Sequence, residues 1–563
     1  MVFLAAALAS SVALARSAEP RSAVADAAMS RDAPTVRALL ARGADVNTAQ
    51  GDGMTALHWA AKNGDADLAA TLLAAGANVR ATSRLGGYTP LHLAAAAGAA
   101  AVVDALLRAD AGVDAPTSTG TTPLMLAAAA GSVPTVEALL ARGADANHRE
   151  GANGETALMF AAARDRADVV RALLERGADA DLASTIVDVS KLTAPEERLQ
   201  AAIREAQSQP TKTVAGIVAA PPAPPGGVAG VTRAFTFDEL IGRQGGLTAL
   251  HFAARQGHAA SVRALVEHGA RVDAATGDGT TPLVIATING HYDTAAFLLE
   301  HGADPNRASA NGMTALYAVL NIEWAPRMFY PQPRAQLQET RSYLDLMKAL
   351  LDKGADPNAR LTRKVWYTQY NFDLLRIDES GATPFWRAAY ASDIAAMRLL
   401  VERGADPAIP TMKPAGRTRV GDNERENLEL AGVPPVPVGG PGMPPLLAAA
   451  GAGYGEGFAA NAHRFAPTGM LAAVKYLVEE LHADVNARDS EGNTALHNAA
   501  SRGDNEMIRY LVSKGADATL VNRMGQTTVD MANGPVQRTQ PYPDTIKLLE
   551  SLGARNNHKC VSC

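Results

Sequence analysis

Hydrophobic residues recur along this chain in short blocks, and each block has the spacing of one buried face of a helix. Residues 91–95, Leu-His-Leu-Ala-Ala, form one such block. Thr89 in front of it is a favourable N-cap, Pro90 suits the first helical position, and Gly98 is expected to end the helix. A second apolar block follows at 102–107. The pattern therefore predicts a pair of short helices joined by a tight turn.

This helix pair recurs with a period of about 33 residues. The threonine that begins the first helix stands at 55, 89 and 122, so the first two steps are 34 and 33 residues. Further copies begin at 156, 248, 281, 314, 383, 494 and 527, with a weaker copy at 444. A single pair cannot bury its own apolar face, whereas stacked neighbours can, so the period predicts a stack of helix pairs.

The fullest copies have the residues Thr-Pro-Leu-His-x-Ala-Ala-x-x-Gly, followed by Val-x-x-Leu-Leu-x-x-Gly-Ala-Asp-x-Asn. In these residues the chain closely resembles the ankyrin repeat family, over about four-fifths of its length. The resemblance implies an all-α ankyrin-repeat solenoid of about twelve helix-pair units, with β-hairpin fingers and several loop insertions. It also implies a role in binding proteins. The units at 21–50 and 524–555 depart from the pattern, as is expected of units that cap the ends.

Interruptions of the period predict the insertions. The longest lies between Gly177 and Thr248, which stand 71 residues apart where a regular unit has 12 or 13. Two more interrupt hairpin connections, after Gly354 and after Gly404, and two others separate paired helices in the units that begin at 314 and 444. Because insertions in repeat proteins often mark the binding edge, the three on the hairpin side indicate where a partner would bind.

The predicted organisation alternates repeats with insertions. Inside the longest insertion, a short predicted helix at 195–203 precedes a Pro-rich linker at 221–227. The predicted parts are a signal peptide at 1–20, an N-terminal repeat array at 21–185, the insertion at 186–244, repeats at 245–410, a Pro- and Gly-rich insertion at 411–441, a C-terminal array at 442–557 and a Cys-containing tail at 558–563. The pattern leaves open whether the repeats stack continuously across 186–244.

Two insertions carry aromatic residues in a chain where Phe, Trp and Tyr make up only 5% of the sequence. One contains Trp324 within 324–330, and the other contains Trp366 within 366–372. Aromatic residues are enriched among the anchors of protein interfaces, which makes Trp324 and Trp366 candidate partner-binding residues. The alternative is that both segments fold back and cover exposed faces of the repeats.

The concave helix face is the second candidate binding surface. Variable positions near the ends of the first helices would face it, and they are the better candidates for specificity: Lys62, Asn63, Arg164, Arg255, Gln256, Arg387 and Tyr390. The apolar residue after the repeated histidine, such as Trp59 or Phe160, is expected to pack between neighbouring pairs. A groove for an apolar partner segment is the alternative for that position.

A histidine recurs at one position of the repeat, at 58, 92, 251 and 497. The ankyrin resemblance implies that this side chain ties the start of a helix to the neighbouring hairpin by hydrogen bonds. A metal site is not expected, because successive copies belong to different units and because Met125, Met159 and Tyr317 replace the histidine elsewhere.

No catalytic arrangement is recognisable in the sequence. The chain lacks a G-x-S-x-G elbow, a P-loop, an H-E-x-x-H helix and a dinucleotide-binding glycine motif, so no catalytic residue, cofactor or enzymatic activity is predicted. Cys560 and Cys563 are the two cysteines of the chain and form a C-x-x-C candidate redox pair. A tail without a set role, a bond to another chain, and a haem or metal site are the alternatives.

Charge and the first residues add two expectations. The chain has 52 basic and 58 acidic residues and a net charge of −6, which does not favour nucleic-acid binding. Residues 1–15 are uncharged, largely apolar and end in Ala13-Leu14-Ala15, a pattern typical of a signal peptide. Export to the periplasm or the extracellular space is therefore predicted, with an alanine-rich helix on a cytoplasmic protein as the alternative. No later segment has the length and hydropathy of a membrane span.

The function predicted from the sequence is that of a non-enzymatic protein–protein interaction scaffold. It would bind an unidentified protein partner through the concave helix face, the hairpin tips and the aromatic insertions. One alternative is a redox or electron-transfer accessory that acts through Cys560 and Cys563, and another is a structural spacer. The sequence identifies neither the partner nor the oligomeric state.

Overall fold

The computed structural model describes residues 22–192, 231, 235, 237–325, 334–365, 377–415, 432–453, 464–534 and 540–560. The chain divides into two compact units. The first unit consists of the described residues up to Thr185 together with Thr248–Ala253 and His258–Arg271. The second consists of Ile186–Leu247, Ala254–Gly257 and the residues from Val272 onward. The predicted signal peptide at 1–20 and the predicted helix at 195–203 lie outside the described residues.

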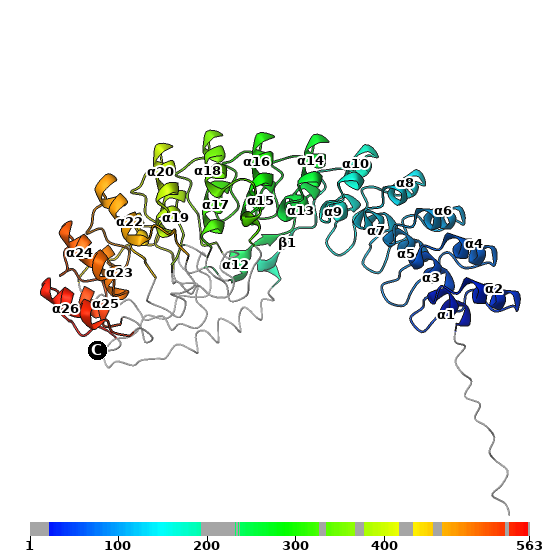
Figure 1. Ribbon diagram of the computed structural model, residues 1–563, viewed down its shortest axis with the longest axis horizontal. Helices are drawn as coiled ribbons and strands as arrows, with labels where there is room; N and C mark the ends of the chain where they lie inside the picture. The colour runs from blue at the N-terminus through cyan, green and yellow to red at the C-terminus, as the bar shows by residue number, and fades with distance from the viewer. Residues whose placement is uncertain are drawn as a thin grey trace, which may run out of the picture. The chain divides into compact units, whose positions relative to one another are not determined.

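In the first unit, short helices alternate as first and second members of successive pairs (Figure 1). The first members are α1 (Ala23–Met29), α3 (Ala56–Asn63), α5 (Pro90–Ala96), α7 (Pro123–Ala130) and α9 (Ala157–Ala162). The second members are α2 (Ala33–Ala41), α4 (Ala66–Ala74), α6 (Ala100–Arg108), α8 (Val133–Ala141), α10 (Ala167–Glu175) and α14 (Ala259–Glu267). First members pack against first members of the next pair, and from α4 onward second members pack against second members. The predicted all-α solenoid of helix pairs is confirmed.

The second unit repeats this arrangement with longer connections. Its first members are α15 (Pro282–Ile288), α17 (Ala315–Glu323), α19 (Pro384–Tyr390), α21 (Pro445–Ala449), α23 (Ala495–Ser501) and α25 (Thr528–Ala532). Its second members are α16 (Tyr292–Glu300), α18 (Tyr343–Asp352), α20 (Ile394–Glu402), α22 (Met470–Lys475), α24 (Asn505–Ser513) and α26 (Pro543–Ser551). Helix α22 continues as a π-helix over Tyr476–Glu480, α13 (Ala249–Gln256) is shared between the units, and a short 3₁₀ turn, η2, covers Ala335–Leu337.

The local sequence explains why each pair forms. The hydroxyl of Thr89 caps α5 by accepting a hydrogen bond from the backbone N–H of His92 at 3.4 Å. Leu91 and Ala94 then lie fully buried on the inner face. Burial of a leucine side chain stabilises a fold by about 1.5–3 kcal/mol, and alanine at the other inner positions lets the neighbouring helices approach closely. Gly98 ends the first helix with φ of +68°, a conformation that favours glycine.

The repeats of the first unit continue across the longest insertion, because α14 packs directly on α10. The ring of His258 bonds to the carbonyl of Ala162 through Nδ1 at 3.0 Å. The hydroxyl of Ser261 donates to Asp165 Oδ1 at 2.9 Å. Within the first unit, the helix α14 that follows the insertion therefore stacks on α10, which precedes it.

Both ends of that insertion return to one place in the second unit. Strand β1 (Val187–Asp188) pairs antiparallel with β2 (Arg243–Gln244), with Asp188 opposite Arg243. The described elements between them are the 3₁₀ turn η1 (Val189–Lys191) and helix α12 (Phe237–Ile241). The insertion therefore leaves and rejoins the repeats through a small β-ribbon, and α12 directly precedes its second strand.

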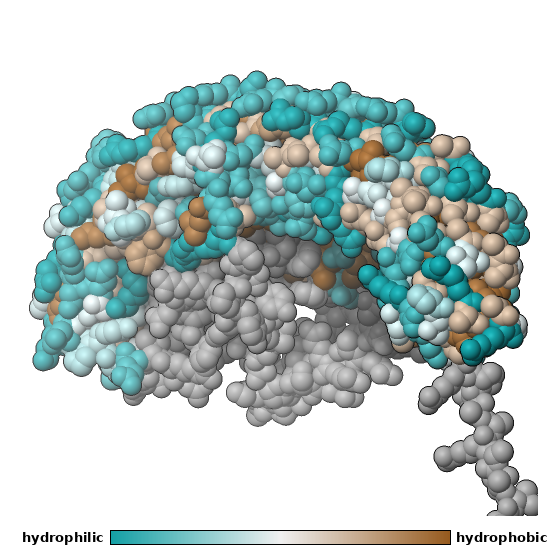
Figure 2. All heavy atoms as spheres, turned by 45° about the vertical axis from the view of Figure 1, so that its right-hand side comes forward, coloured by the Kyte–Doolittle hydropathy of each residue, from teal (hydrophilic) through white to brown (hydrophobic). Residues whose placement is uncertain are grey.

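Hydrophilic residues cover most of the outer surface that Figure 2 shows, with hydrophobic residues scattered between them. Leu85, at the tip of a hairpin finger, is 80% exposed and Tyr88 is 37% exposed. Helices in the described part of the chain are all too short or too polar to cross a membrane.

Candidate functional site

The repeated histidine is buried and holds the start of its helix. The N–H of Thr55 donates to His58 Nδ1 at 3.1 Å, so Nδ1 is an acceptor and Nε2 carries the proton. Nε2 in turn donates to the carbonyl of Tyr88 in the next unit, at 3.0 Å. His92 and His497 make the same two contacts in their own units. The tie between helix start and neighbouring hairpin that the family resemblance implies is confirmed.

Burial sets the charge state of these rings. It lowers the pKa of His58 and of His92 below the ordinary value for histidine, and it lowers the pKa of His497 to about 4. The three rings are therefore neutral near pH 7, and both nitrogens of each ring take part in hydrogen bonds. A ring in this state has no nitrogen lone pair left for a metal ion, so these histidines belong to the scaffold.

The C-terminal ends of several first helices are exposed, while their N-terminal parts are buried. Lys62 is exposed at the end of α3, where its ammonium lies 4.8 Å from the centre of the Trp59 ring. Arg164, Arg255 and Gln256 are exposed at the corresponding ends of the units that contain α9 and α13. Three of these four helix-end residues are cations, so the exposed ends have a positive character.

Asn63 contributes to the fold as well as to the surface. It is half-buried, and its side-chain amide donates to the carbonyl of Ala28 in the preceding unit at 3.2 Å. This residue therefore ties neighbouring pairs together at the end of α3.

Two residues that were expected to face the concave surface are buried instead. Arg387 is 2% exposed and Tyr390 is 4% exposed. The guanidinium of Arg387 donates to Asn321 Oδ1 at 2.9 Å and to the carbonyl of Trp324 at 3.0 Å. Tyr390 stacks on Trp386, with ring centroids 5.2 Å apart. The expectation for both residues is wrong, because the end of α17 and the segment after it cover α19, which the repeat period does not reveal.

Trp324 is part of that cover. Its indole N–H donates to Asp393 Oδ2 at 2.9 Å, and its ring lies edge-on to Tyr343 with centroids 6.2 Å apart. These contacts favour the alternative in which the segment that begins at Trp324 folds back on the repeats. Trp366, the second aromatic candidate, lies outside the described residues.

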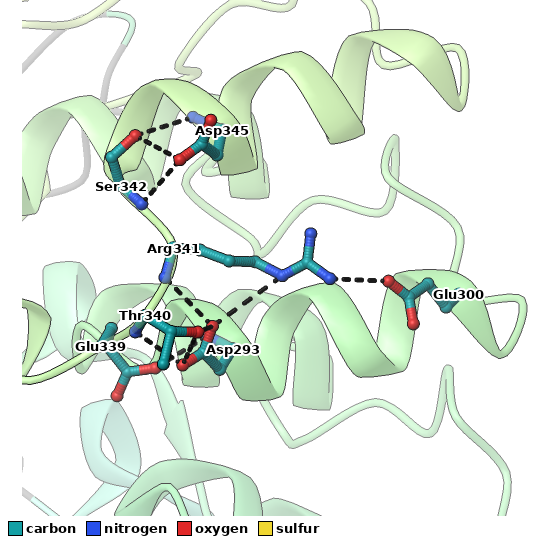
Figure 3. A network of polar contacts seen from close by, with 7 residues as sticks. All are labelled: Asp293, Glu300, Glu339, Thr340, Arg341, Ser342 and Asp345. Carbon is teal, nitrogen blue, oxygen red and sulfur yellow. Dashed lines mark hydrogen bonds and ion pairs between the residues drawn. The ribbon is translucent and has the colours of Figure 1, made fainter.

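A polar network anchors the other end of the same insertion to α16 (Figure 3). The carboxylate of Asp293 accepts hydrogen bonds from the backbone N–H of Thr340 at 2.8 Å and from that of Arg341 at 3.2 Å. The guanidinium of Arg341 also donates to Glu300 at 3.0 Å, and Ser342 is the N-cap of α18. Burial raises the pKa of Asp293, but hydrogen bonds from Thr340 outweigh burial and hold the pKa below its usual value.

The three insertions on the hairpin side meet at one cavity of about 90 Å³ in the second unit, which we call the insertion cavity. Leu240 of α12 comes from the insertion at 186–244, Arg363 from the connection after α18, and Lys413 from the insertion at 411–441. Segments far apart in the sequence therefore build a single concave site, on the edge that the interruptions of the period indicate.

Backbone hydrogen bonds hold the walls of the insertion cavity together. The N–H of Met412 donates to the carbonyl of Ser380 at 2.7 Å, which joins the second and third insertions. The N–H of Lys413 donates to the carbonyl of Gly440 at 2.9 Å, which joins the two ends of the third. The lining side chains are therefore carried on ordered backbone.

Cations outnumber acids among the side chains that line the insertion cavity. Arg363, Lys364 and Lys413 line it, and Asp378 is the acidic residue of the lining. The ammonium of Lys413 donates to the carbonyl of Val436 at 2.8 Å, which fixes its position. The cavity is therefore positively charged.

Arg363 is the most confined of these cations. Its Nη1 donates to the carbonyl of Glu239 at 3.1 Å, and its guanidinium lies 5.4 Å from the centre of the Phe235 ring. Burial lowers the pKa of Arg363, which Asp278 partly offsets, yet an arginine keeps its charge at neutral pH. Neither Arg363 nor Lys413 was predicted from the sequence; the signal that could have found them was the shared edge of the three insertions.

The C-terminal tail is described as far as Cys560. Cys560 is disulfide-bonded, and Cys563 lies outside the described residues. The side-chain amide of Gln526 donates to the carbonyl of Lys559 at 2.9 Å, which holds the tail against the last unit. The redox role of the Cys560 and Cys563 pair stays a prediction.

Stacked pairs with capped helix starts and hairpin fingers define a helical repeat protein. Family models described as ankyrin repeats in three copies match residues 24–117, 101–184 and 233–309, and a model described as ankyrin repeats in many copies matches 476–532. The chain belongs to the ankyrin repeat family. Ankyrin repeats generally mediate protein–protein interaction and are generally non-catalytic.

Individual relatives share only part of their length with this chain. Ankyrin repeat and SAM domain-containing protein 6 of Rattus norvegicus is 37% identical over 103 residues, 17% of this chain and 11% of that protein. Alpha-latrocrustotoxin-Lt1a of Latrodectus tredecimguttatus is 25% identical over 217 residues, 38% of this chain and 10% of that protein. Among solved structures, the human ASB11 ankyrin repeat domain has a TM-score of 0.37 and 24% identity, with 51% of this chain and 100% of that chain covered.

Proposed function

We propose that this chain is a non-enzymatic scaffold that binds a protein partner through the exposed ends of its first helices and the hairpin side of its repeats. The observation that carries the proposal is the matching exposure of Lys62, Arg164, Arg255 and Gln256. The repeated residues around them are buried and are used to cap helices and to join neighbouring units. Variable, exposed residues on a repeated frame are a suitable basis for specific recognition.

Rigid display is the mechanism that this arrangement supports. The helix starts are buried, and His58 and His92 join the starts of α3 and α5 to the adjacent hairpin by hydrogen bonds. A surface that is already ordered loses little conformational entropy on association, so a larger share of the contact energy contributes to affinity. Long cationic side chains at these ends favour a partner surface of negative charge.

The test compares partner capture by two matched variants of the full chain. Lys62→Ala, Arg164→Ala and Arg255→Ala are combined in one variant, since alanine already occupies the exposed end of α5 at Ala96. The control combines Arg37→Ala, Arg108→Ala and Arg176→Ala, which also removes three positive charges, from exposed positions on or at the end of second helices.

We expect partner affinity, measured by quantitative pull-down from the native compartment, to fall about tenfold or more in the first variant and to stay within about twofold in the control. Equal capture by wild type and both variants would exclude the helix ends as the binding surface. It would also favour a structural spacer.

A second candidate function is a redox accessory role through the C-terminal tail. The disulfide bond at Cys560 favours it. Titration of thiols with and without reductant, in wild type and in Cys560→Ser, would measure whether the pair cycles. If a thioredoxin-like reductant does not reduce the disulfide, the tail has no redox activity.

We also propose that the protein is exported. Support comes from the apolar residues 1–15 with Ala13-Leu14-Ala15 and from the disulfide bond, which forms and persists in oxidising compartments. The mass of the protein isolated from its native compartment tests this, because removal of a signal peptide shortens the chain by about 15–20 residues.

A further inference from the structure

We propose that the insertion cavity binds a carboxylate group carried by an acidic segment of the protein partner. This inference rests on the proposed scaffold function and names the chemistry that one part of the surface recognises. The occupant is thus a short stretch of Asp or Glu on another protein, one side chain of which enters the cavity.

The size of the cavity suits a single small polar group. Its volume is about 90 Å³, well above the roughly 10–15 Å³ that a single water molecule requires. A carboxylate group fits this space. Ordered backbone forms the walls, so the site is present before a ligand arrives.

Arg363 supplies the most specific part of the argument. Its Nε is buried and has no hydrogen-bond partner among the described residues, while Nη1 donates to the carbonyl of Glu239. The edge of a guanidinium formed by Nε and Nη2 is one that binds a carboxylate with two parallel hydrogen bonds. A buried N–H without an acceptor is energetically unfavourable. A ligand oxygen that accepts from this N–H therefore gains more binding free energy than it would from an exposed arginine.

The described acids near Arg363, Asp378 and Asp278, accept hydrogen bonds within their own turns. Asp378 lines the same cavity, but its Oδ1 accepts from the N–H of Ser380 at 2.8 Å within its own turn. Asp278 lies close enough to affect Arg363, yet its Oδ1 accepts from Thr280 N at 3.2 Å. Within the described part of the chain, neither carboxylate forms an ion pair with Arg363. An incoming carboxylate would therefore meet Arg363, with Lys413 on the same lining.

The experiment uses the full chain and two synthetic peptides labelled with fluorescein. One peptide, Gly-Ser-Glu-Glu-Glu-Ser-Gly, carries the carboxylates, and the other has glutamine in place of each glutamate. Fluorescence polarisation at low ionic strength measures both. We expect saturable binding of the glutamate peptide and at least about tenfold weaker binding of the glutamine peptide.

Variants of the chain locate the site. Arg363→Gln is expected to weaken binding of the glutamate peptide about tenfold. The affinity of Arg363→Lys is expected to lie between those of Arg363→Gln and wild type, because lysine keeps the positive charge but lacks the two parallel N–H donors of the guanidinium. Arg243→Gln is the matched control: it removes one positive charge from an exposed position of β2 outside the cavity, and it should change binding less than about twofold. Thermal unfolding of each variant confirms that the fold is intact, and Arg363→Lys keeps the test valid if Arg363→Gln unfolds.

Several results would overturn the inference. With wild type, the inference fails if the glutamate peptide does not bind or if the glutamine peptide binds equally well. With the variants, it fails if Arg363→Gln keeps the affinity of wild type or loses no more affinity than Arg243→Gln. Sodium phosphate that protects the wild type against thermal unfolding, with no peptide binding, would indicate a site for a free anion. If the glutamate peptide fails while capture of the partner still depends on Lys62, Arg164 and Arg255, the scaffold function stands and only the cavity assignment fails.

Discussion

At the scale of single residues, His497 shows how burial converts a titratable group into part of the frame. Its ring is 0% exposed and accepts a hydrogen bond from the N–H of Thr494 at 3.2 Å. Burial lowers its pKa to about 4, against about 6.5 for a histidine in the unfolded chain. The native state therefore binds fewer protons than the unfolded state between these values, and folding stability falls as the pH drops through this interval.

The first prediction concerns His497→Met, since methionine fills the same position in other units at Met125 and Met159. Between pH 7 and pH 5, wild type should lose on the order of 2 kcal/mol relative to the variant, while no such difference develops above about pH 7. Urea unfolding at pH 7, 6 and 5 measures it. Parallel profiles for the two proteins would contradict the assignment.

Asp489, which lies in the same repeat as His497, also affects the pH dependence of folding stability, so wild type has to be compared with His497→Met. Partial burial raises the pKa of its carboxyl to about 6, so the native state binds an extra proton below that pH. Its contribution therefore rises as the pH falls, which is the opposite of the effect of His497. The wild-type profile alone mixes the two groups, whereas the difference between wild type and His497→Met isolates the histidine.

At the scale of elements, the segment between α17 and α18 is anchored at both ends. Trp324 is held through Asp393 at the start, and Thr340 and Arg341 are held through Asp293 at the end. Each contact is a hydrogen bond to a carboxylate, which is stronger than a bond between neutral groups. The described ends of this insertion therefore behave as part of the solenoid.

The second prediction is that Asp293→Ala releases the end of this segment without unfolding the repeats. The backbone N–H groups of Thr340 and Arg341 would lose their acceptor, so their hydrogen exchange should accelerate about tenfold or more. Glu300→Ala is the control, because Glu300 accepts from the guanidinium of Arg341 and not from the backbone N–H groups that Asp293 binds. Unchanged exchange at Thr340 in Asp293→Ala would mean that other contacts hold the segment.

At the scale of the whole molecule, the repeats depend on stacking between consecutive units and not on the longest insertion. In the first unit, α14 packs on α10, and His258, Ser261 and Arg271 join its repeat to the preceding repeat by hydrogen bonds to Ala162, Asp165 and Asp181. The stability of a repeat array is a sum of unit terms and interfaces between neighbours. Removing a segment that lies outside those interfaces should therefore leave the array intact.

The third prediction tests this with a precise excision. Residues 189–242 are replaced by Asn-Gly, a two-residue turn that suits antiparallel strands, because Asp188 and Arg243 are already paired. Hydrogen exchange of α14 should stay within about threefold of wild type, while the glutamate peptide should no longer bind, since α12 lines the insertion cavity. Asp165→Ala, which removes the acceptor of Ser261, should in contrast accelerate exchange in α14.

The sequence could predict those parts of the candidate site that depend on contacts within one repeat. Exposure at Lys62 and Arg164 was predictable, because both residues lie at the C-terminal end of a helix whose inner face is specified by spacing alone. Burial of Arg387 was not predictable, because the carbonyl that covers it comes from Trp324, 63 residues earlier in the sequence. Arg363 was missed for a related reason: its surroundings are assembled from three insertions whose spacing has no repeat.

The sequence by itself determined the repeat, the helix pairs, the family and the edge on which the insertions lie. Each of these depends on contacts within about one period, where spacing, capping residues and glycines specify the geometry. Only the tertiary structure decided that α14 stacks on α10, that Arg387 is covered, and that Leu240, Arg363 and Lys413 meet in one positively charged cavity. Those contacts join residues tens to more than a hundred positions apart, and their side chains carry no periodic pattern, so packing in three dimensions specifies them.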